Sequence, residues 1–409
     1  MTLSDPQWRS NFRSFIWHAT FLALTTSFMD VDTIIPSMMI KAGGTSLHLG
    51  LLTAIMTGGA SLSQLVFGGF LSGKQRKKIY LLLAIHLRVI SLLFLSMLFF
   101  YSPNLSGDAI IASIFLLISL FSFSGAFANV SYMDILGKSV LPAARKRFFS
   151  IKQVVNSVGI MASTLVVREL LKIYDYPSNY GVLFLIAGLM LWVATGGFWK
   201  ISEALIPQQK KLGLMGYLSR IPGEIRSNSN LRNYLLIINT MGLGLGVLPF
   251  AILLAKTRYG LGYGMIGNFL LFRTIGMLAA GLILYRLSSK IHYPTLLKFC
   301  LVVGAMVPVL CLVITDNQTL YQLVFALAGV YVACFKMATN GVLLEISTNE
   351  NRALYTGISG AGSILTAVFP LLAGALIPLV GFSVVFLAVA MLMFSSFIFV
   401  LKLKCKPRS

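Results

Sequence analysis

The sequence predicts an all-α membrane protein with twelve transmembrane helices, arranged as two bundles of six. Hydrophobic residues make up 57% of the chain and charged residues 11%, whereas soluble domains average about 25% charged residues. Twelve apolar stretches are each long enough to cross a bilayer, which takes about 20 residues as a helix. One long polar connection divides them into six and six. This composition excludes a soluble enzyme and a disordered chain.

The predicted spans follow one another with short connections. They lie near residues 15–40, 47–71, 79–101, 109–133, 148–172 and 180–200 in the first half, and near 233–256, 262–286, 294–315, 319–345, 353–378 and 381–402 in the second. We therefore expect an N-terminal six-helix bundle at residues 1–200, a cytoplasmic linker at 201–232 and a C-terminal six-helix bundle at 233–409.

The distribution of charge predicts the orientation. The chain has 33 Lys and Arg against 12 Asp and Glu, a net charge of +21. Basic residues accumulate in the cytoplasmic loops of membrane proteins. With the N-terminus inside, the side opposite the cytoplasm holds only Lys41, Lys172, Lys256 and Arg258. We therefore expect both termini in the cytoplasm, and no nucleic-acid partner, because the loop bias alone accounts for the positive charge.

No feature of the sequence indicates catalysis. The chain contains no Walker loop, dinucleotide fingerprint or cluster of metal ligands, and its four cysteines have no CxxC spacing. We therefore expect a protein that is not an enzyme and that binds no cofactor and no metal ion. Any transport would draw its energy from an ion gradient.

Similar turns follow the fourth span of each half. Asp134 ends one span and Arg145 opens the next, and Glu345 and Arg352 occupy the corresponding places in the second half. Because both halves start on the same side, we expect parallel repeats related by an axis along the membrane normal. Six spans, a basic middle loop, six more spans and these acid and Arg positions resemble the Major Facilitator Superfamily over essentially the whole chain. The most similar segment, residues 133–150, looks like the family's turn between spans 4 and 5.

The turn between spans 2 and 3 departs from the family pattern of a Gly, an Asp four residues later, and then a Gly with basic residues. Gly69 and the basic run match, but Gly73 stands in place of the Asp and Arg76 in place of the second Gly. In the family this Asp helps to latch the two halves on the cytoplasmic side, so the resemblance implies a latch that is absent or rebuilt. Residues 155–162 also lack the Gly-Pro motif of drug antiporters. The resemblance implies the major facilitator fold, and it assigns no substrate.

Two acidic residues lie in span 1, past its middle and before Pro36: Asp30 and Asp32. A carboxylate in a low-dielectric cavity can load and release a proton reversibly, so both are candidates for proton coupling. In the alternative interpretation the helix ends or bends before Pro36, and the acids are caps or salt-bridge partners near the outer interface. Both interpretations stay open.

Two cations are candidates for substrate binding. Arg273 lies near the middle of span 8, and Lys336 lies in span 10, which the resemblance places along the central cavity. A guanidinium at this depth needs a carboxylate, several polar groups or an anionic substrate. The alternatives are a fixed ion pair of Arg273 with an acid such as Asp30 or Asp32, and a Lys336 side chain that reaches the cytoplasmic surface.

Other cations in the spans have a structural interpretation. For His86 and Arg88 in span 3 we favour a structural pair, and for Lys152 a side chain that reaches back to the membrane surface. Uncharged polar residues that could complete a substrate cavity, or only join helices by hydrogen bonds, are Gln64, Asn129, Asn156, Asn239 and Asn340.

Charged residues at the cytoplasmic turns are candidates for gating, since their pairs could stabilise an outward-open state. They are Asp134, Arg145, Arg147, Glu345 and Arg352. Basic turns could equally reflect only the loop bias, or bind anionic lipid.

Together these features predict a secondary active transporter that moves a small organic solute by alternating access, with protons as the coupling ion. Bases outnumber acids among the deep groups, which slightly favours an anionic or zwitterionic solute. The alternatives are a proton-coupled exporter of lipophilic or cationic compounds, and a non-transporting or lipid-handling protein on the same fold. The expected partners are the solute, the proton and the lipid bilayer. We expect a monomer, and the short loops suggest a multi-pass protein of a bacterial inner membrane.

Overall fold

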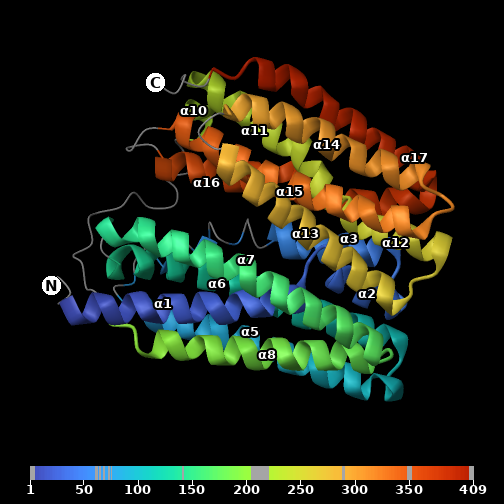
Figure 1. Cartoon of the computed structure of the whole chain (residues 1–409), viewed down its shortest axis with the longest axis horizontal. Helices are drawn as coiled ribbons and strands as arrows, with labels where there is room; N and C mark the ends of the chain where they lie inside the picture. The colour runs from blue at the N-terminus through green and yellow to red at the C-terminus, as the bar shows by residue number, and fades with distance from the viewer. Residues whose placement is uncertain are drawn as a thin grey trace. The chain divides into compact units, whose positions relative to one another are not determined.

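The computed structural model describes residues 5–59, 63, 66–67, 70–71, 74, 76–140, 142–203, 221–287, 291–347 and 352–404. These residues form helices joined by turns, with no strand among them, as Figure 1 shows. In this part of the chain, nine helical stretches are long and apolar enough to cross a membrane. The predicted all-helical, multi-pass membrane protein is therefore confirmed. The chain forms two compact units: unit 1 is residues 1–43 and 59–211, and unit 2 is residues 44–58 and 212–409.

Unit 1 has its core where three long helices meet. Its elements are α1 (Asp5–Thr26), η1 (Ser27–Met29), α2 (Ile34–Lys41), α5 (Lys78–Tyr101), η3 (Ser102–Asn104), α6 (Gly107–Ser139), α7 (Pro142–Ile173) and α8 (Ser178–Trp199). Helix α8 packs against both α1 and α5, which also contact α7 and α6, respectively. Phe15, Phe99, Phe184 and Phe198 are fully buried there. Aromatic side chains of this size dominate the area that such a core buries.

Unit 2 contains one short helix from early in the sequence. Its elements are α3 (Ser46–Ala54) with its continuation η2 (Ile55–Gly59), α10 (Ile221–Ser227), α11 (Ser229–Gly242), η4 (Leu243–Gly246), α12 (Leu248–Tyr259), α13 (Tyr263–Leu287), α14 (Tyr293–Val313), α15 (Gln318–Ile346), α16 (Arg352–Gly362) and α17 (Ile364–Leu401). Helix α3 packs against α17, and the Ser46 hydroxyl donates to the Gly374 carbonyl at 2.8 Å. Residues 46–59 were predicted to belong to the N-terminal bundle.

Three predicted spans are not single helices. The first breaks between α1 and α2, and the seventh consists of α11, η4 and α12. Predicted span 11 consists of α16 and the first part of α17, which continues through Gly381 (φ 82°) into predicted span 12. Glycine costs about 1 kcal/mol relative to alanine inside a helix, and η4 has the sequence Leu-Gly-Leu-Gly. Local backbone preferences therefore break the helix within apolar stretches that hydropathy alone predicts as single spans.

Candidate functional site

An aromatic cluster surrounds one face of α6 in the interior of unit 1. Phe121 and Tyr132 are eleven residues, or about three helical turns, apart and so share this face. The Tyr132 ring centroid lies 5.3 Å from that of Phe15 and 6.0 Å from that of His18, both on α1. Phe198 of α8 completes the cluster, with its centroid 4.1 Å from that of His18. Three helices therefore contribute π faces to one region.

Arg88 of α5 lies against this aromatic face. Its Cζ is 4.2 Å from the centroid of Phe121, a cation–π contact. Gly125 leaves room for the guanidinium, because a Cβ at that position would lie 3.3 Å from Arg88 Nε. Nε is buried and makes no hydrogen bond. The structural pair favoured for His86 and Arg88 does not form, since His86 Nδ1 instead contacts the Leu82 carbonyl at 2.7 Å.

Lys152 of α7 is the second cation at this face. Its Nζ lies 5.2 Å from the Tyr132 centroid, and the side chain is half-buried. Both Lys152 and Arg88 lie within electrostatic reach of His18. Among the described residues, the ion pairs of unit 1 join other side chains, so neither cation is neutralised by a carboxylate.

This arrangement favours the binding of an anion. A charged side chain at membrane depth costs several kcal/mol, while a desolvated cation–π contact returns only about 2 kcal/mol. A carboxylate or phosphate would add charge-assisted hydrogen bonds to either cation. Structural interpretations were favoured for Arg88 and Lys152 from their places in spans 3 and 5, and the aromatic rings opposite them were not considered. The signal available in the sequence was the aromatic spacing of Phe121 and Tyr132 on the neighbouring span.

The two acids of span 1 lie at the break between η1 and α2. Asp30 Oδ1 accepts hydrogen bonds from the backbone N–H of Asp32 at 3.1 Å and from the Thr33 hydroxyl at 2.8 Å. Both acids are half-buried. Asp30 therefore caps the turn, as the alternative interpretation of the sequence described. Proton coupling by Asp30 or Asp32 stays a prediction.

The predicted substrate residues of unit 2 differ in exposure. Arg273 on α13 is 8% exposed. Its backbone lies against α15, because a Cβ at Gly329 would be 2.0 Å from the Arg273 carbonyl oxygen. Lys336 and Asn340 are exposed and lie one turn apart on the same face of α15.

The remaining polar candidates have different surroundings. Asn239 joins helices: its Nδ2 donates to the Gly362 carbonyl at 2.7 Å, and its Oδ1 accepts from the Leu365 N–H at 2.8 Å. It thus spans the break between α16 and α17. Asn129 is exposed and Asn156 half-buried. Gln64 lies outside the described residues.

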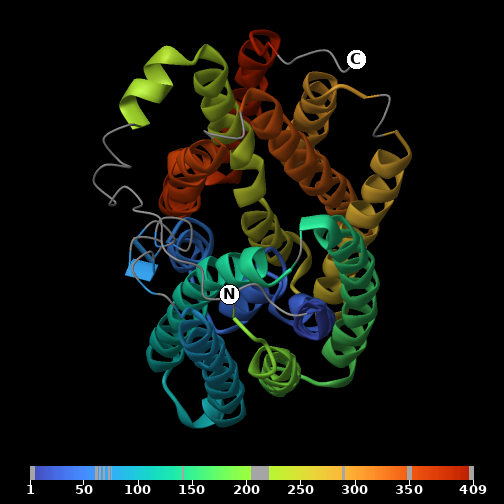
Figure 2. The ribbon, with the colours of Figure 1, turned by 90° about the vertical axis from the view of Figure 1, so that its left-hand side faces the viewer.

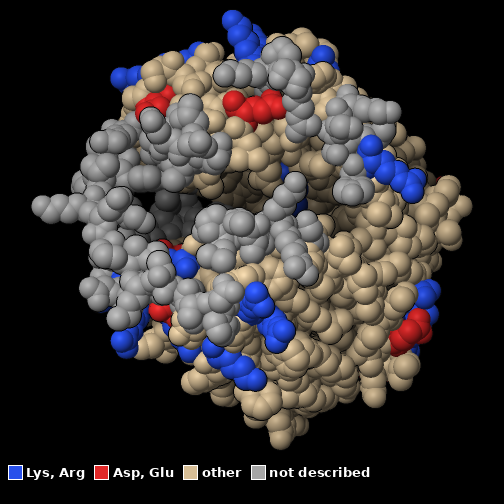
Figure 3. Space-filling model, turned by 60° about the vertical axis from the view of Figure 1, so that its left-hand side comes forward, with Lys and Arg blue, Asp and Glu red and all other residues tan. Residues whose placement is uncertain are grey.

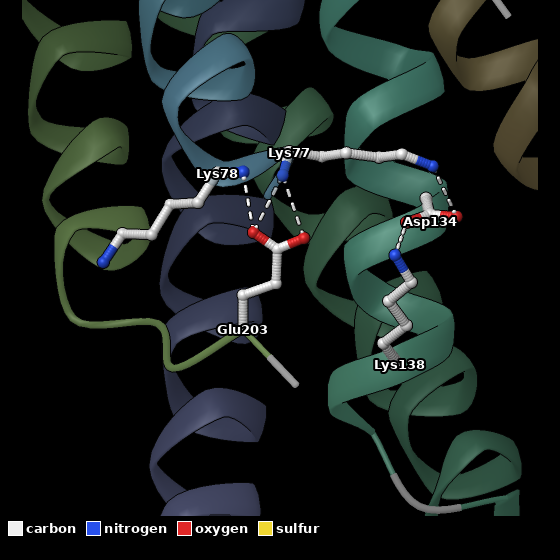
Figure 4. Close-up of polar contacts among 5 residues, drawn as sticks. All are labelled: Lys77, Lys78, Asp134, Lys138 and Glu203. Carbon is white, nitrogen blue, oxygen red and sulfur yellow. Dashed lines mark hydrogen bonds and ion pairs between the residues drawn. The ribbon is translucent and has the colours of Figure 1, made fainter. Parts of the chain in front are cut away.

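A charged network joins the ends of α5, α6 and α8 on the predicted cytoplasmic side (Figure 4). Asp134 pairs with Lys138 and, at 2.9 Å, with Lys77. Both carboxylate oxygens of Glu203 accept from the Lys77 N–H at 2.9 Å, and Oε2 also accepts from the Lys78 N–H at 2.9 Å. Lys78 Nζ donates to the Trp199 carbonyl at 2.8 Å. The network fixes the N-terminus of α5 to the segment after α8.

Asp134 of this network was predicted as a gating residue together with Arg145 and Arg147, whose side chains lie outside the described residues. Glu203 was not predicted, although it is an isolated acid directly after span 6. In unit 2, Glu345 is half-buried, and the side chain of Arg352 is not among those described. Gly69 and Gly73 of the turn between spans 2 and 3 also lie outside the described residues.

Solved structures of transporters share this fold over nearly the whole chain. A POT family transporter in complex with 5-aminolevulinic acid has a TM-score of 0.72 at 11% identity, covering 96% of this chain and 94% of that one. The nucleoside transporter NupG has a TM-score of 0.69 at 12% identity, covering 96% and 99%. A bacterial homologue of the human lysosomal transporter Spinster, inward-facing and unoccupied, has a TM-score of 0.62 at 11% identity, covering 98% and 96%. No curated protein matches the sequence.

The fold of the chain is thus the one that these solved transporters have. Residues 234–409 match the family model of the Major Facilitator Superfamily. The second half of the chain thus matches the family whose resemblance the sequence showed.

Proposed function

We propose that the protein is a proton-coupled secondary active transporter that moves a small organic anion or zwitterion by alternating access. The observation that supports the choice of solute is the pair of cations, Arg88 and Lys152, held on the aromatic face of α6 without a carboxylate among the described residues. An anionic group would bind there by charge-assisted hydrogen bonds. The transporter fold supports the alternating-access mechanism.

The roles of the other candidates belong to the same proposal. Arg273 and Lys336 contribute to solute binding from unit 2, together with the polar side chains of Gln64, Asn129, Asn156, Asn239 and Asn340. Asp30 and Asp32 carry the coupling proton. Asp134, Arg145, Arg147, Glu345 and Arg352 act in gating, and the network of Lys77 and Glu203 belongs to the same end. We further propose a monomer with cytoplasmic termini in a bacterial inner membrane, built as bundles at 1–200 and 233–409 joined by a linker at 201–232.

The first experiment measures the thermal stability of the purified protein against a panel of soluble compounds at two pH values. The panel contains dicarboxylates, amino acids including 5-aminolevulinic acid, sugars, nucleosides and cationic dyes. A ligand present at about 100 times its Kd stabilises the folded state by about 2.7 kcal/mol. We expect stabilisation by one anionic or zwitterionic family, with a pH dependence that reports proton linkage.

Three variants test whether the compound that stabilises the protein binds at Arg88 and Lys152. Arg88→Gln and Lys152→Gln each remove a charged hydrogen-bond partner, worth about 1.5–3 kcal/mol, so the Kd should rise about 10- to 100-fold. Arg168→Gln is the matched control, because Arg168 lies on the same helix as Lys152 and contacts Glu169 at 3.3 Å in an exposed pair.

The other outcomes contradict the proposal in different ways. Stabilisation by lipophilic cations alone would favour the exporter. No stabilisation by any compound would favour a non-transporting or lipid-handling protein. An anion whose Kd is unchanged in both Arg88→Gln and Lys152→Gln would remove these two residues from the site while leaving transport of an anion in place.

A further inference from the structure

A groove of about 760 Å³ lies between α1 and α8 in unit 1. Figure 2 shows these two helices, dark blue and green, nearly end on and side by side. Gly197 permits the close contact below the groove, since a Cβ there would lie 2.5 Å from the Ser14 carbonyl oxygen. Gly196 beside it is exposed, and a Cβ there would meet nothing closer than Trp17 Nε1 at 3.9 Å. The helices therefore touch at Gly197, and the groove beside this contact stays open at Gly196.

Three cations line the groove. Arg9 and Arg13 are one helical turn apart on α1, and Lys200 directly follows the last residue of α8. All three side chains are exposed, and no Asp or Glu is among the described residues that line the groove. On the face that Figure 3 draws, Lys and Arg side chains lie in separate groups among uncharged side chains. The groove thus presents a concentrated positive charge.

An exposed apolar stripe leads away from these cations. Trp17 is 47% exposed, and its indole N–H donates to the Val193 carbonyl at 2.9 Å, which fixes the ring beside the groove. On α8, Leu185, Leu189 and Trp192 are 37%, 48% and 58% exposed. Their spacing of four and three residues places them on one face, which Gly196 and Lys200 continue at four-residue steps. Charge, interfacial tryptophan and apolar stripe therefore follow one another along the helix axis.

We propose that this groove binds an anionic membrane phospholipid, with the head-group phosphate on Arg9, Arg13 and Lys200 and an acyl chain along the α8 stripe. Tryptophan is favoured at the level of the head groups, and the end of unit 1 that carries these cations is the predicted cytoplasmic one, where anionic lipids attract basic clusters. The site is independent of the solute site proposed above, because no residue that lines the groove belongs to the Arg88 and Lys152 site.

The test titrates phosphatidylglycerol or phosphatidylcholine into the delipidated full-length protein in detergent and counts bound lipids by native mass spectrometry. We expect phosphatidylglycerol to bind more tightly than phosphatidylcholine. The triple variant Arg9→Gln, Arg13→Gln, Lys200→Gln should weaken phosphatidylglycerol binding at least about tenfold, since each cation near a lipid surface contributes about 1 kcal/mol. The matched control Arg226→Gln, Arg232→Gln, Arg286→Gln removes three exposed charges from unit 2 and should bind as the parent does.

A third variant tests the open space of the groove separately from its charge. Gly196→Leu keeps all three cations and fills the open position, so it should lower phosphatidylglycerol binding to a similar extent. Equal binding of the two lipids to the parent, or equal loss in the two triple variants, would overturn the proposal. Glycerol 3-phosphate that competes with phosphatidylglycerol at equal concentration would show a site for soluble phosphate compounds and overturn the lipid assignment.

Discussion

Glu203 is the residue whose replacement tests the charged network most directly. Its half-buried carboxylate accepts from the backbone N–H groups of Lys77 and Lys78, which open α5 and have no partner inside the helix. Charged hydrogen bonds contribute about 1.5–3 kcal/mol each, but water can replace part of this at a half-exposed site. We therefore expect Glu203→Ala to lower the free energy of unfolding by about 2 kcal/mol, the value of a strong helix cap. Glu203→Gln keeps one acceptor oxygen and should cost about half as much.

The assay is unfolding of the purified protein in detergent, by heat and by SDS, together with limited trypsin digestion at the Lys-rich segment that ends at Lys78. Loss of the cap should speed cleavage there. Glu169→Ala is the control, because this carboxylate is 53% exposed and its pairs with Arg168 and Lys172 are of a kind worth about 0–1 kcal/mol. Equal stability and equal trypsin cleavage of Glu203→Ala and Glu169→Ala would refute the capping role.

Three further predictions concern close packing and the first span. Gly329→Ala places a Cβ 2.0 Å from a backbone oxygen of α13 and should cost about 2–3 kcal/mol in SDS unfolding, whereas Gly281→Ala, with open space around it, should be neutral or slightly stabilising. Gly125→Ala displaces the guanidinium of the candidate site and should weaken anion binding several-fold in the thermal assay, while Gly137→Ala on the same helix should leave it unchanged. Asp30→Asn retains the acceptor oxygen of the turn, so it should preserve thermal stability yet abolish proton-driven uptake; uptake that survives in proteoliposomes would contradict its coupling role.

Hydropathy was enough to predict the helical membrane fold, because a bilayer requires long apolar stretches whose backbone groups are satisfied within the helix. It could not predict where such stretches break. The turn at Asp30 depends on a side-chain oxygen that accepts from Asp32 and Thr33, and the short η4 depends on glycines inside an otherwise apolar run. These are local hydrogen bonds and backbone preferences that a window of about 20 residues averages away.

The candidate site was only partly visible in the sequence for a similar reason. Depth along a span indicates the cost of burying a charge and does not indicate what lies opposite it. Arg88 was predicted to pair with His86 and lies instead on the ring of Phe121, and the contact of Lys152 with the ring of Tyr132 was not predicted. Glu203 was missed because its partners are the backbone N–H groups of Lys77 and Lys78, 126 and 125 residues earlier, and no charge pattern records such a contact.

The contacts of Arg88 and Lys152 with aromatic rings, rather than with carboxylates among the described residues, affect how a transporter could use these cations. A cation fixed by a carboxylate must lose that partner before it binds a substrate anion, and breaking a buried pair costs about 3–5 kcal/mol. A cation on an aromatic face keeps its N–H groups available, because the π contact uses the face of the guanidinium or one side of the ammonium group. Arg88 over Phe121 and Lys152 over Tyr132 are of this kind. Binding and release of an anion then require no exchange of ion pairs, which suits a site that must fill and empty in every cycle.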